Sequence, residues 1–233
     1  ALGIINSDDI QMDCYFDGSQ SYTKKSLSDC DMNGNIYFST SLSSGKHSAV
    51  VYFSYTSQSY DRWSAPLPNA LRMLGIRLAP GAQICSLEGT ANQPKAKRVL
   101  MYGDSITEGV WIGESEYGYA PVLARKLGVE YSQCGYGWIG WSHFGSGCTD
   151  HFYYMNSERG MWKNYYRGHS RLNDVNDPSK GYIDGAPDAV FITLGHNDLG
   201  NTGEITQKVT AWLYDVRAAI GNDAQIFMIL PLV

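Results

Sequence analysis

RVLMYGDSITEG, residues 98–109, is the stretch that decides the fold of the second half of the chain. Its first part, RVLMY, is apolar and predicts a buried strand, and the GDS that follows predicts a tight turn. An open α/β sheet presents reactive side chains at the carboxyl ends of its strands, where such a turn exposes a serine hydroxyl. Ser105 is therefore the candidate nucleophile.

Two further polar clusters follow predicted strands. Residues 189–194 (AVFITL) predict a second buried strand, and GHND at residues 195–198 comes directly after it. Residues 129–132 (VEYS) predict another strand, which is followed by CGYG at residues 134–137. Parallel strands end at the same edge of a sheet, so we expect the three clusters to form one site.

The three clusters contain the groups that acyl transfer by a serine requires. Ser105 supplies the nucleophile, and the expected oxyanion donors are its own N–H, the side-chain amide of Asn197 and a glycine N–H from the CGYG loop. Its position at the strand end favours Gly135 as that glycine, with Gly137 as the alternative. Each motif also occurs by itself in ordinary turns and helix starts, but their order along the chain favours catalysis.

We expect the aspartate and histidine residues near these clusters to support the structure or line the pocket. We expect Asp104 to hold the serine turn by hydrogen bonds and Asp198 to cap the helix that follows it. His196 is expected to line the pocket, and His47 to be structural. The remaining histidines lie in the long segment between the second and third clusters: His143, His151 and His169.

The rest of the second half alternates between strands and helices. Residues 119–127 predict a helix that Gly128 ends, and apolar residues at helical spacing predict another over residues 205–220. Residues 226–230 predict a fourth buried strand. This pattern indicates a three-layer α/β/α domain with a parallel sheet. Such a sheet normally continues with a further helix and strand, so we expect the domain to be C-terminally incomplete at Val233.

The first ninety or so residues predict a different architecture. Apolar and polar residues alternate over residues 10–16, 47–55 and 74–78, and an Asn-Gly turn precedes a short apolar run at 36–38. Several short alternating strands predict an antiparallel β-sandwich. The polar segment 91–96 marks the boundary, which gives a first domain of residues 1–94 and a second of residues 95–233.

The composition indicates which binding partners and which cellular compartment to expect. The net charge is −5 without a basic run, which excludes nucleic acid and anionic membrane surfaces as expected partners, and no apolar stretch approaches the roughly 20 residues of a membrane helix. No cluster of metal ligands is visible, so we expect neither a metal nor a cofactor. Few charges and many Tyr, Ser, Gly and Asn favour a secreted protein. The five cysteines either form two pairs, Cys14 with Cys30 and Cys134 with Cys148, leaving Cys85 free, or are all buried thiols.

The three clusters resemble the first three sequence blocks of the SGNH (GDSL-type) esterases. The resemblance implies that Ser105 is the nucleophile and Asn197 an oxyanion donor, with Gly135 or Gly137 as the glycine donor. The fourth block, which carries the catalytic histidine, has no counterpart here and belongs beyond Val233. A missing C-terminal segment or a second chain is therefore expected to carry that histidine.

A narrower resemblance concerns residues 44–50, residues 73–78 and the strand before Ser105. These are similar to the end of the β-sandwich in carbohydrate esterase family two, whose members join an N-terminal jelly roll to an SGNH domain and deacetylate plant polysaccharides. The resemblance implies an acetylesterase that acts on a carbohydrate such as xylan. The aromatic-rich insertion at residues 141–186 departs from that family, and its aromatic side chains either stack on sugars or form a satellite core.

Two alternatives to this function remain open. A lipase, thioesterase or acyltransferase is possible on the same scaffold, because a fold does not determine its substrate. A non-catalytic carbohydrate-binding protein is the second alternative, in which the catalytic histidine is genuinely absent. The intact Ser105 and Asn197 disfavour that alternative.

Overall fold

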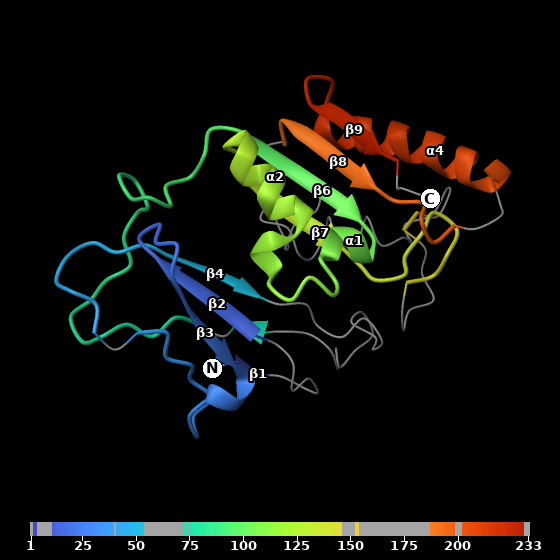
Figure 1. Ribbon diagram of the computed structural model, residues 1–233. Coiled ribbons are helices and arrows are strands. Elements are labelled where there is room, and N and C mark those ends of the chain that lie inside the picture. The colour runs from blue at the N-terminus through green and yellow to red at the C-terminus, as the bar shows by residue number, and fades with distance from the viewer. Residues whose placement is uncertain are drawn as a thin grey trace. The chain divides into compact units, whose positions relative to one another are not determined.

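The computed structural model describes residues 2–3, 11–39, 41–53, 72–73, 75–145, 152–153, 187–198 and 202–230. Contacts divide the chain into two compact units (Figure 1). The first comprises Ala1–Pro94 together with Gly113–Glu116, and the second comprises Lys95–Ile112 and Tyr117–Val233.

The first unit contains a three-stranded antiparallel sheet in the order β3-β2-β4. Its elements are β2 (Gln11–Phe16), β3 (Tyr22–Ser26), the 3-10 helix η1 (Leu27–Asp29) and β4 (Ala49–Phe53), and the short strands β1 (Leu2–Gly3) and β5 (Arg72–Met73) pair with each other. The alternating patterns therefore predicted β2 and β4 correctly. The predicted strand at 36–38 is wrong, as is the one at 74–78 for its described residues 75–78, because both stretches lack regular structure. The jelly roll itself stays a prediction.

The described cysteines carry free thiols: Cys14, Cys30, Cys85 and Cys134. The pairing of Cys14 with Cys30 and of Cys134 with Cys148 is therefore wrong, although Cys148 itself lies outside the described residues. Cys14 lies in the central strand β2 with its side chain in the core, 2% exposed. Burial raises the pKa of Cys14 to about 11 and that of Cys134 to about 12, so both thiols stay protonated and unreactive at neutral pH.

The second unit contains a four-stranded parallel sheet in the order β7-β6-β8-β9. Its elements are β6 (Arg98–Gly103), α1 (Ser105–Glu108), η2 (Ser115–Tyr117), which begins in the first unit, α2 (Tyr119–Leu127), β7 (Glu130–Gly135), β8 (Ala189–Thr193), α4 (Thr202–Ile220) and β9 (Gln225–Ile229). The prediction that Gly128 ends α2 is confirmed, because Gly128 adopts the left-handed conformation with φ 66°. Within the described parts of the chain, no helix is long and apolar enough to cross a membrane.

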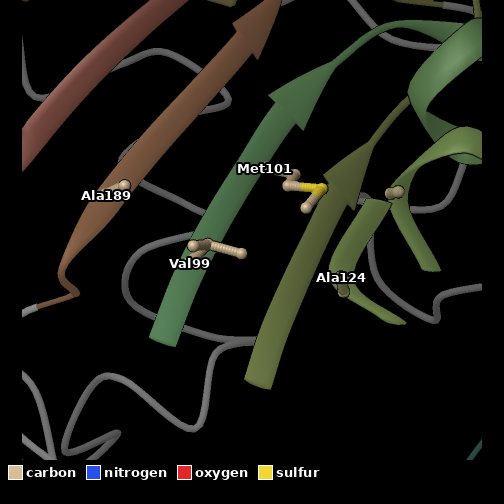
Figure 2. Packing of buried hydrophobic residues seen from close by; sticks show 5 residues of the cluster. Val99, Met101, Ala124 and Ala189 are labelled. Carbon is tan, nitrogen blue, oxygen red and sulfur yellow. The ribbon is translucent and has the colours of Figure 1, made fainter. Parts of the chain in front are cut away.

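Helices cover both faces of this sheet. Val99 and Met101 of β6 point to one face, where they pack with Ala124 of α2 (Figure 2). Successive side chains of a strand point to opposite faces, so Tyr102 lies on the other one, where its ring meets Trp212 of α4 with 6.2 Å between the centroids. The continuous apolar run of β6 is thus buried on both sides, and the predicted α/β architecture with a parallel sheet is confirmed.

The start of the insertion is anchored in the same core. Trp141 and Phe152 are 1% and 0% exposed, and each packs edge-on or tilted against Trp212, with centroid distances of 5.6 and 5.8 Å. Aromatic pairs of this kind contribute about 0.5–1.5 kcal/mol each beyond the burial of their area. For these two residues the core alternative is confirmed. The aromatic residues of the insertion between 154 and 186 lie outside the described residues.

An ion pair joins two turns of the first unit. The Nδ1 atom of His47 lies 2.7 Å from a carboxylate oxygen of Asp17, and its Nε2 atom lies 3.0 Å from the backbone oxygen of Ser43. The other oxygen of Asp17 accepts the Ser48 N–H at 2.8 Å. The expected structural role of His47 is thus confirmed. The hydrogen bond that His47 donates to Asp17 raises the pKa of His47 above 6.5, and the same hydrogen bond lowers the pKa of Asp17 below 3.8.

These shifts define a pH window for the pair. The contribution of His47 to stability is complete below pH 6.5 and is lost as the pH rises through its folded pKa. The contribution of Asp17 is present above pH 3.8 and is lost as the pH falls through its folded pKa. We therefore expect an NMR titration of His47 to give a pKa above 6.5, which Asp17→Asn should return toward that value.

The control for this titration is Ser43→Ala, which removes only the hydroxyl and keeps the backbone acceptor. It should leave the pKa of His47 nearly unchanged. A His47 that titrates at 6.5 in the unmodified protein would contradict the pairing.

Candidate active site

The strand register places the three polar clusters at one edge of the parallel sheet. Gly103, the last residue of β6, lies opposite Gly135 of β7 and opposite Thr193 of β8. The chain runs from β6 to β7 on one side and reaches β8 on the other, so the strand order reverses at β6. Open α/β sheets bind their ligands at such a switch point, outside the carboxyl ends of the strands. Ser105 and Asn197 each follow this row within a few residues.

Ser105 is the first residue of the short helix α1 and is half-buried. Asp104 caps this helix, because its carboxylate accepts the N–H of Ile106 at 2.9 Å. The expectation that Asp104 holds the serine turn is therefore confirmed. Gly109 ends the helix in the left-handed conformation, and its N–H donates to the Ser105 carbonyl at 3.0 Å. The N–H of Ser105 has no acceptor within the helix, since the first N–H groups of any helix lack one.

The Asp104 carboxyl group is fully buried. Burial raises its pKa above the ordinary value, while the Ile106 N–H and the charge of His196 act in the opposite direction. His196 itself is exposed, next to Asn197. Protein groups rather than water therefore surround the Asp104 carboxyl group.

Two glycines allow α1 to rest directly on the ends of the strands. A Cβ atom on Gly103 would lie 1.8 Å from Thr107 Oγ1, and one on Gly135 would lie 2.2 Å from the backbone nitrogen of Glu108. The side chain of Gln133 adds a hydrogen bond of 2.6 Å to the Thr107 carbonyl. Any side chain at the end of β6 or β7 would therefore displace the helix that carries Ser105.

A partly buried network of hydroxyl groups joins α1, α2 and β8. The Thr107 hydroxyl of α1 hydrogen-bonds the Tyr119 hydroxyl of α2 at 2.8 Å, and Tyr119 hydrogen-bonds the Thr193 hydroxyl of β8 at 3.0 Å. Burial raises the pKa of Tyr119, so its hydroxyl stays protonated. The network connects α1, which carries Ser105, to the strand that leads to Asn197.

The side-chain amide of Asn197 is held against the loop that follows β7. Its Nδ2 atom donates to the Ile139 carbonyl at 3.0 Å, which occupies one of the two amide hydrogens. Gly195 has a φ of 126°, and its carbonyl accepts the Asp198 N–H at 3.1 Å. This tight turn directs Asn197 and Asp198 to the same neighbouring loop.

Asp198 does not cap the following helix, so that expectation is wrong. Its carboxylate accepts the backbone N–H groups of Trp141 and Ser142 at 2.7 Å each and that of His143 at 3.1 Å. Helix α4 begins only at Thr202. The partner of Asp198 is a loop far away in sequence, which no local pattern indicates.

His143, the histidine of the loop after β7, contacts backbone carbonyl groups. His143 is exposed, and its Nδ1 atom lies 2.8 Å from the carbonyl oxygens of Trp138 and Phe144. His151 and His169 lie outside the described residues. Among the residues that the structure describes, no group of three or more His, Cys, Asp or Glu side chains is arranged to hold a metal ion.

Two exposed tryptophans next to the motifs were missed by the sequence analysis. Trp111 follows α1 and is 86% exposed, and Trp138 follows Gly137 and is 52% exposed. Both have positive φ, 71° and 64°, which is rare and strained for a bulky residue. Their nearness in sequence to Gly109 and Gly137 was the only available signal, because the backbone conformation is not visible in the sequence.

The chain is similar in fold to several solved carbohydrate esterases. A family 2 enzyme with a carbohydrate-binding domain from Corynascus thermopiles (Myceliophthora fergusii) matches 99% of this chain and 68% of its own, with a TM-score of 0.59 and 21% identity. A family two enzyme from Clostridium thermocellum, solved in complex with cellohexaose, matches 95% and 64%, with a TM-score of 0.59 and 18% identity. One from Cellvibrio japonicus matches 95% and 63%, with a TM-score of 0.52 and 14% identity.

These similarities establish the fold. The chain spans about two thirds of the length of these enzymes. No protein-family model and no curated protein sequence matches the chain. The structural neighbours are thus enzymes of carbohydrate esterase family 2, the family whose sequence pattern residues 44–50 and 73–78 resemble.

The contact between α1 and Gly135 gives a direct test. Gly135→Ala places a methyl group 2.2 Å from the Glu108 nitrogen, so α1 and Ser105 must shift. We expect a loss of about 1–3 kcal/mol in the free energy of unfolding, measured with denaturant. Gly203→Ala in α4 is the control, because nothing lies within 4 Å of its added Cβ. It should change stability by less than about 1 kcal/mol. Equal effects of the two substitutions would contradict the close packing.

Proposed function

We propose that this chain is the greater part of a secreted serine esterase that removes O-acetyl groups from a carbohydrate. The observation that carries the proposal is that Ser105 and Asn197 follow two neighbouring strands, β6 and β8, which end in register at one edge of the parallel sheet. The structural neighbours are carbohydrate esterases, which supports ester hydrolysis on a sugar as the reaction class. The composition, with few charges and many small polar residues, supports secretion.

In the proposed mechanism the Ser105 Oγ attacks the acetyl carbonyl carbon. The negative charge that develops on the carbonyl oxygen is stabilised by the Ser105 N–H, by the N–H of Gly135 or Gly137 and by the amide of Asn197. The hydrogen bond to Ile139 supports this role of Asn197, since it fixes the amide and leaves its second hydrogen for the oxyanion. Expulsion of the sugar alcohol leaves an acetyl-enzyme, which water hydrolyses to acetate and free Ser105.

The general base is proposed to be a histidine outside these 233 residues, on a C-terminal segment or a second chain. The exposed side chains of β9 support an additional element beside the sheet. β9 is the edge strand, and Phe227 and Met228 are each 42% exposed, with Leu230 just beyond it at 84%. Exposed apolar area of this kind next to the buried strand β8 is typically covered by further structure.

Trp111 and Trp138 support a carbohydrate as the substrate. Indole rings offer broad apolar faces that match the C–H faces of sugar rings. Both side chains are exposed, and both backbones are held at positive φ, a strain that proteins retain mainly at functional sites. Trp111 lies shortly after the helix that begins with Ser105, and Trp138 directly follows Gly137.

The esterase function is tested by substitution of the proposed nucleophile in the intact natural protein. Ser105→Ala should lower kcat for nitrophenyl acetate by about 10⁴-fold or more, and Asn197→Ala by about 10²–10³-fold. Ser28→Ala, at an exposed serine of the first unit, is the control and should have no effect. Hydrolysis that survives Ser105→Ala would contradict the mechanism, and equal rates with acetyl and butyryl esters would contradict acetyl specificity.

The substrate class is tested separately through the two tryptophans. Trp111→Ala and Trp138→Ala should each raise KM for an acetylated oligosaccharide several-fold to about tenfold, because a stacking surface is lost. They should leave KM for nitrophenyl acetate nearly unchanged. Tyr214→Ala removes an aromatic ring of α4 that is 76% exposed and serves as the control. An equal change for both substrates would argue against sugar stacking.

A further inference from the structure

The carboxylate of Asp198 accepts hydrogen bonds from the backbone N–H groups of three consecutive residues. Trp141 and Ser142 donate at 2.7 Å each and His143 at 3.1 Å, and the Ser142 hydroxyl adds a contact of 3.0 Å. Hydrogen bonds to an ionised acceptor are about twice as strong as neutral ones. Four of them on one partly buried side chain therefore hold residues 141–143 firmly.

The loop is shaped to receive this carboxylate. A Cβ atom on Gly140 would lie 2.5 Å from an Asp198 carboxylate oxygen, so the backbone approaches the side chain more closely than any other residue would permit. The Gly140 N–H donates to the His143 carbonyl at 3.0 Å, which closes the turn around Asp198. The Ile139 N–H in turn approaches the Tyr136 carbonyl at 3.4 Å.

Asn197 holds the same loop one step earlier. Its amide donates to the carbonyl of Ile139, whereas the Asp198 carboxylate accepts the N–H of Trp141. The two adjacent side chains therefore bind the loop on either side of Gly140. This loop contains Gly137 and follows Gly135. The orientation of the Asn197 amide and the position of the glycine N–H are thereby coupled.

We propose that Asp198 is a positioning residue for the oxyanion donors: it fixes the loop over residues 136–143 so that Asn197 and the glycine N–H face the same oxygen. This assignment rests on the proposed esterase function. Asp198 does not touch the reacting atoms, and it acts through the loop and through Asn197. Misplacing a catalytic group by about 1 Å costs on the order of 10²-fold in rate, so the loss of the hydrogen bonds to Asp198 should have a measurable effect.

The test is a double-mutant cycle on kcat in the intact natural protein, with nitrophenyl acetate. Asp198→Asn replaces one acceptor oxygen by an NH₂ group that faces backbone donors, so we expect kcat to fall by about 10²-fold with little change in KM. In the Asn197→Ala background the same substitution should cost only about threefold, because only the glycine N–H then remains for Asp198 to position. Ser105→Ala is measured in parallel as the check on the proposed function.

The matched control is Asp215→Asn. Asp215 is a carboxylate of α4 that accepts the Tyr153 hydroxyl at 2.8 Å, so it also ties the insertion to the domain without contacting the loop at 136–143. It should leave kcat unchanged. Hydrogen exchange provides a readout that does not depend on activity: the amides of residues 141–143 should be protected in the unmodified protein and lose protection in Asp198→Asn.

If Asp198→Asn fails to fold, Gly140→Ala takes its place, because its methyl group pushes the loop from the carboxylate and keeps the charge. A large loss of kcat that is not additive with Asn197→Ala supports the assignment. Additive losses, or an unchanged kcat, would overturn it while leaving an esterase that needs Ser105. Full activity of Ser105→Ala would overturn the proposed function and this assignment with it.

Discussion

The contact of α1 with the bare backbone at the ends of β6 and β7 is the constraint on which the site depends. Ser105 begins this helix, and the helix lies so close to the sheet that a Cβ on Gly103 would overlap the Thr107 hydroxyl. A Cβ on Gly135 would likewise overlap the backbone of the same helix at Glu108. Glycine is required at both positions for close approach rather than for conformational freedom, and this requirement explains why the serine motif and the second motif both contain it.

The register of the sheet converts long separations in sequence into neighbouring positions. Gly103 lies opposite Gly135 on one side and Thr193 on the other, so segments about 30 and 90 residues apart end in one row. The loops that leave this row are then joined by side chains rather than by further strands. Tyr119 connects α1 to β8, and Asp198 connects the loop after β8 to the loop after β7.

Local signals predicted the elements whose burial follows from their own pattern. The apolar runs of β6 and β8 are buried on both faces, and α2 ends at its glycine, as their sequences indicate. β3, with the polar sequence YTKKS over Tyr22–Ser26, was missed because pairing with β2 makes it a strand. Residues 36–38 show the reverse, since their apolar pattern finds no neighbouring strand among the described residues. In the site, Ser105 and Asn197 were visible as motifs, whereas the partners of Asp198 and the positive φ of Trp138 depend on tertiary structure.

The proposed oxyanion site must accommodate nearby negative charges, because two carboxyl groups lie beside its residues in sequence. Asp104 precedes the serine, and its environment disfavours the charged form because burial raises its pKa, while the helix N–H that it caps favours it. Asp198 follows Asn197, and its charge is met by three backbone N–H dipoles and a hydroxyl. Those dipoles point at the carboxylate and screen it from the neighbouring edge of the sheet. Adjacent residues thus have different roles in the proposed mechanism: the Asn197 amide keeps one hydrogen for a developing anion, while the Asp198 carboxylate holds the loop.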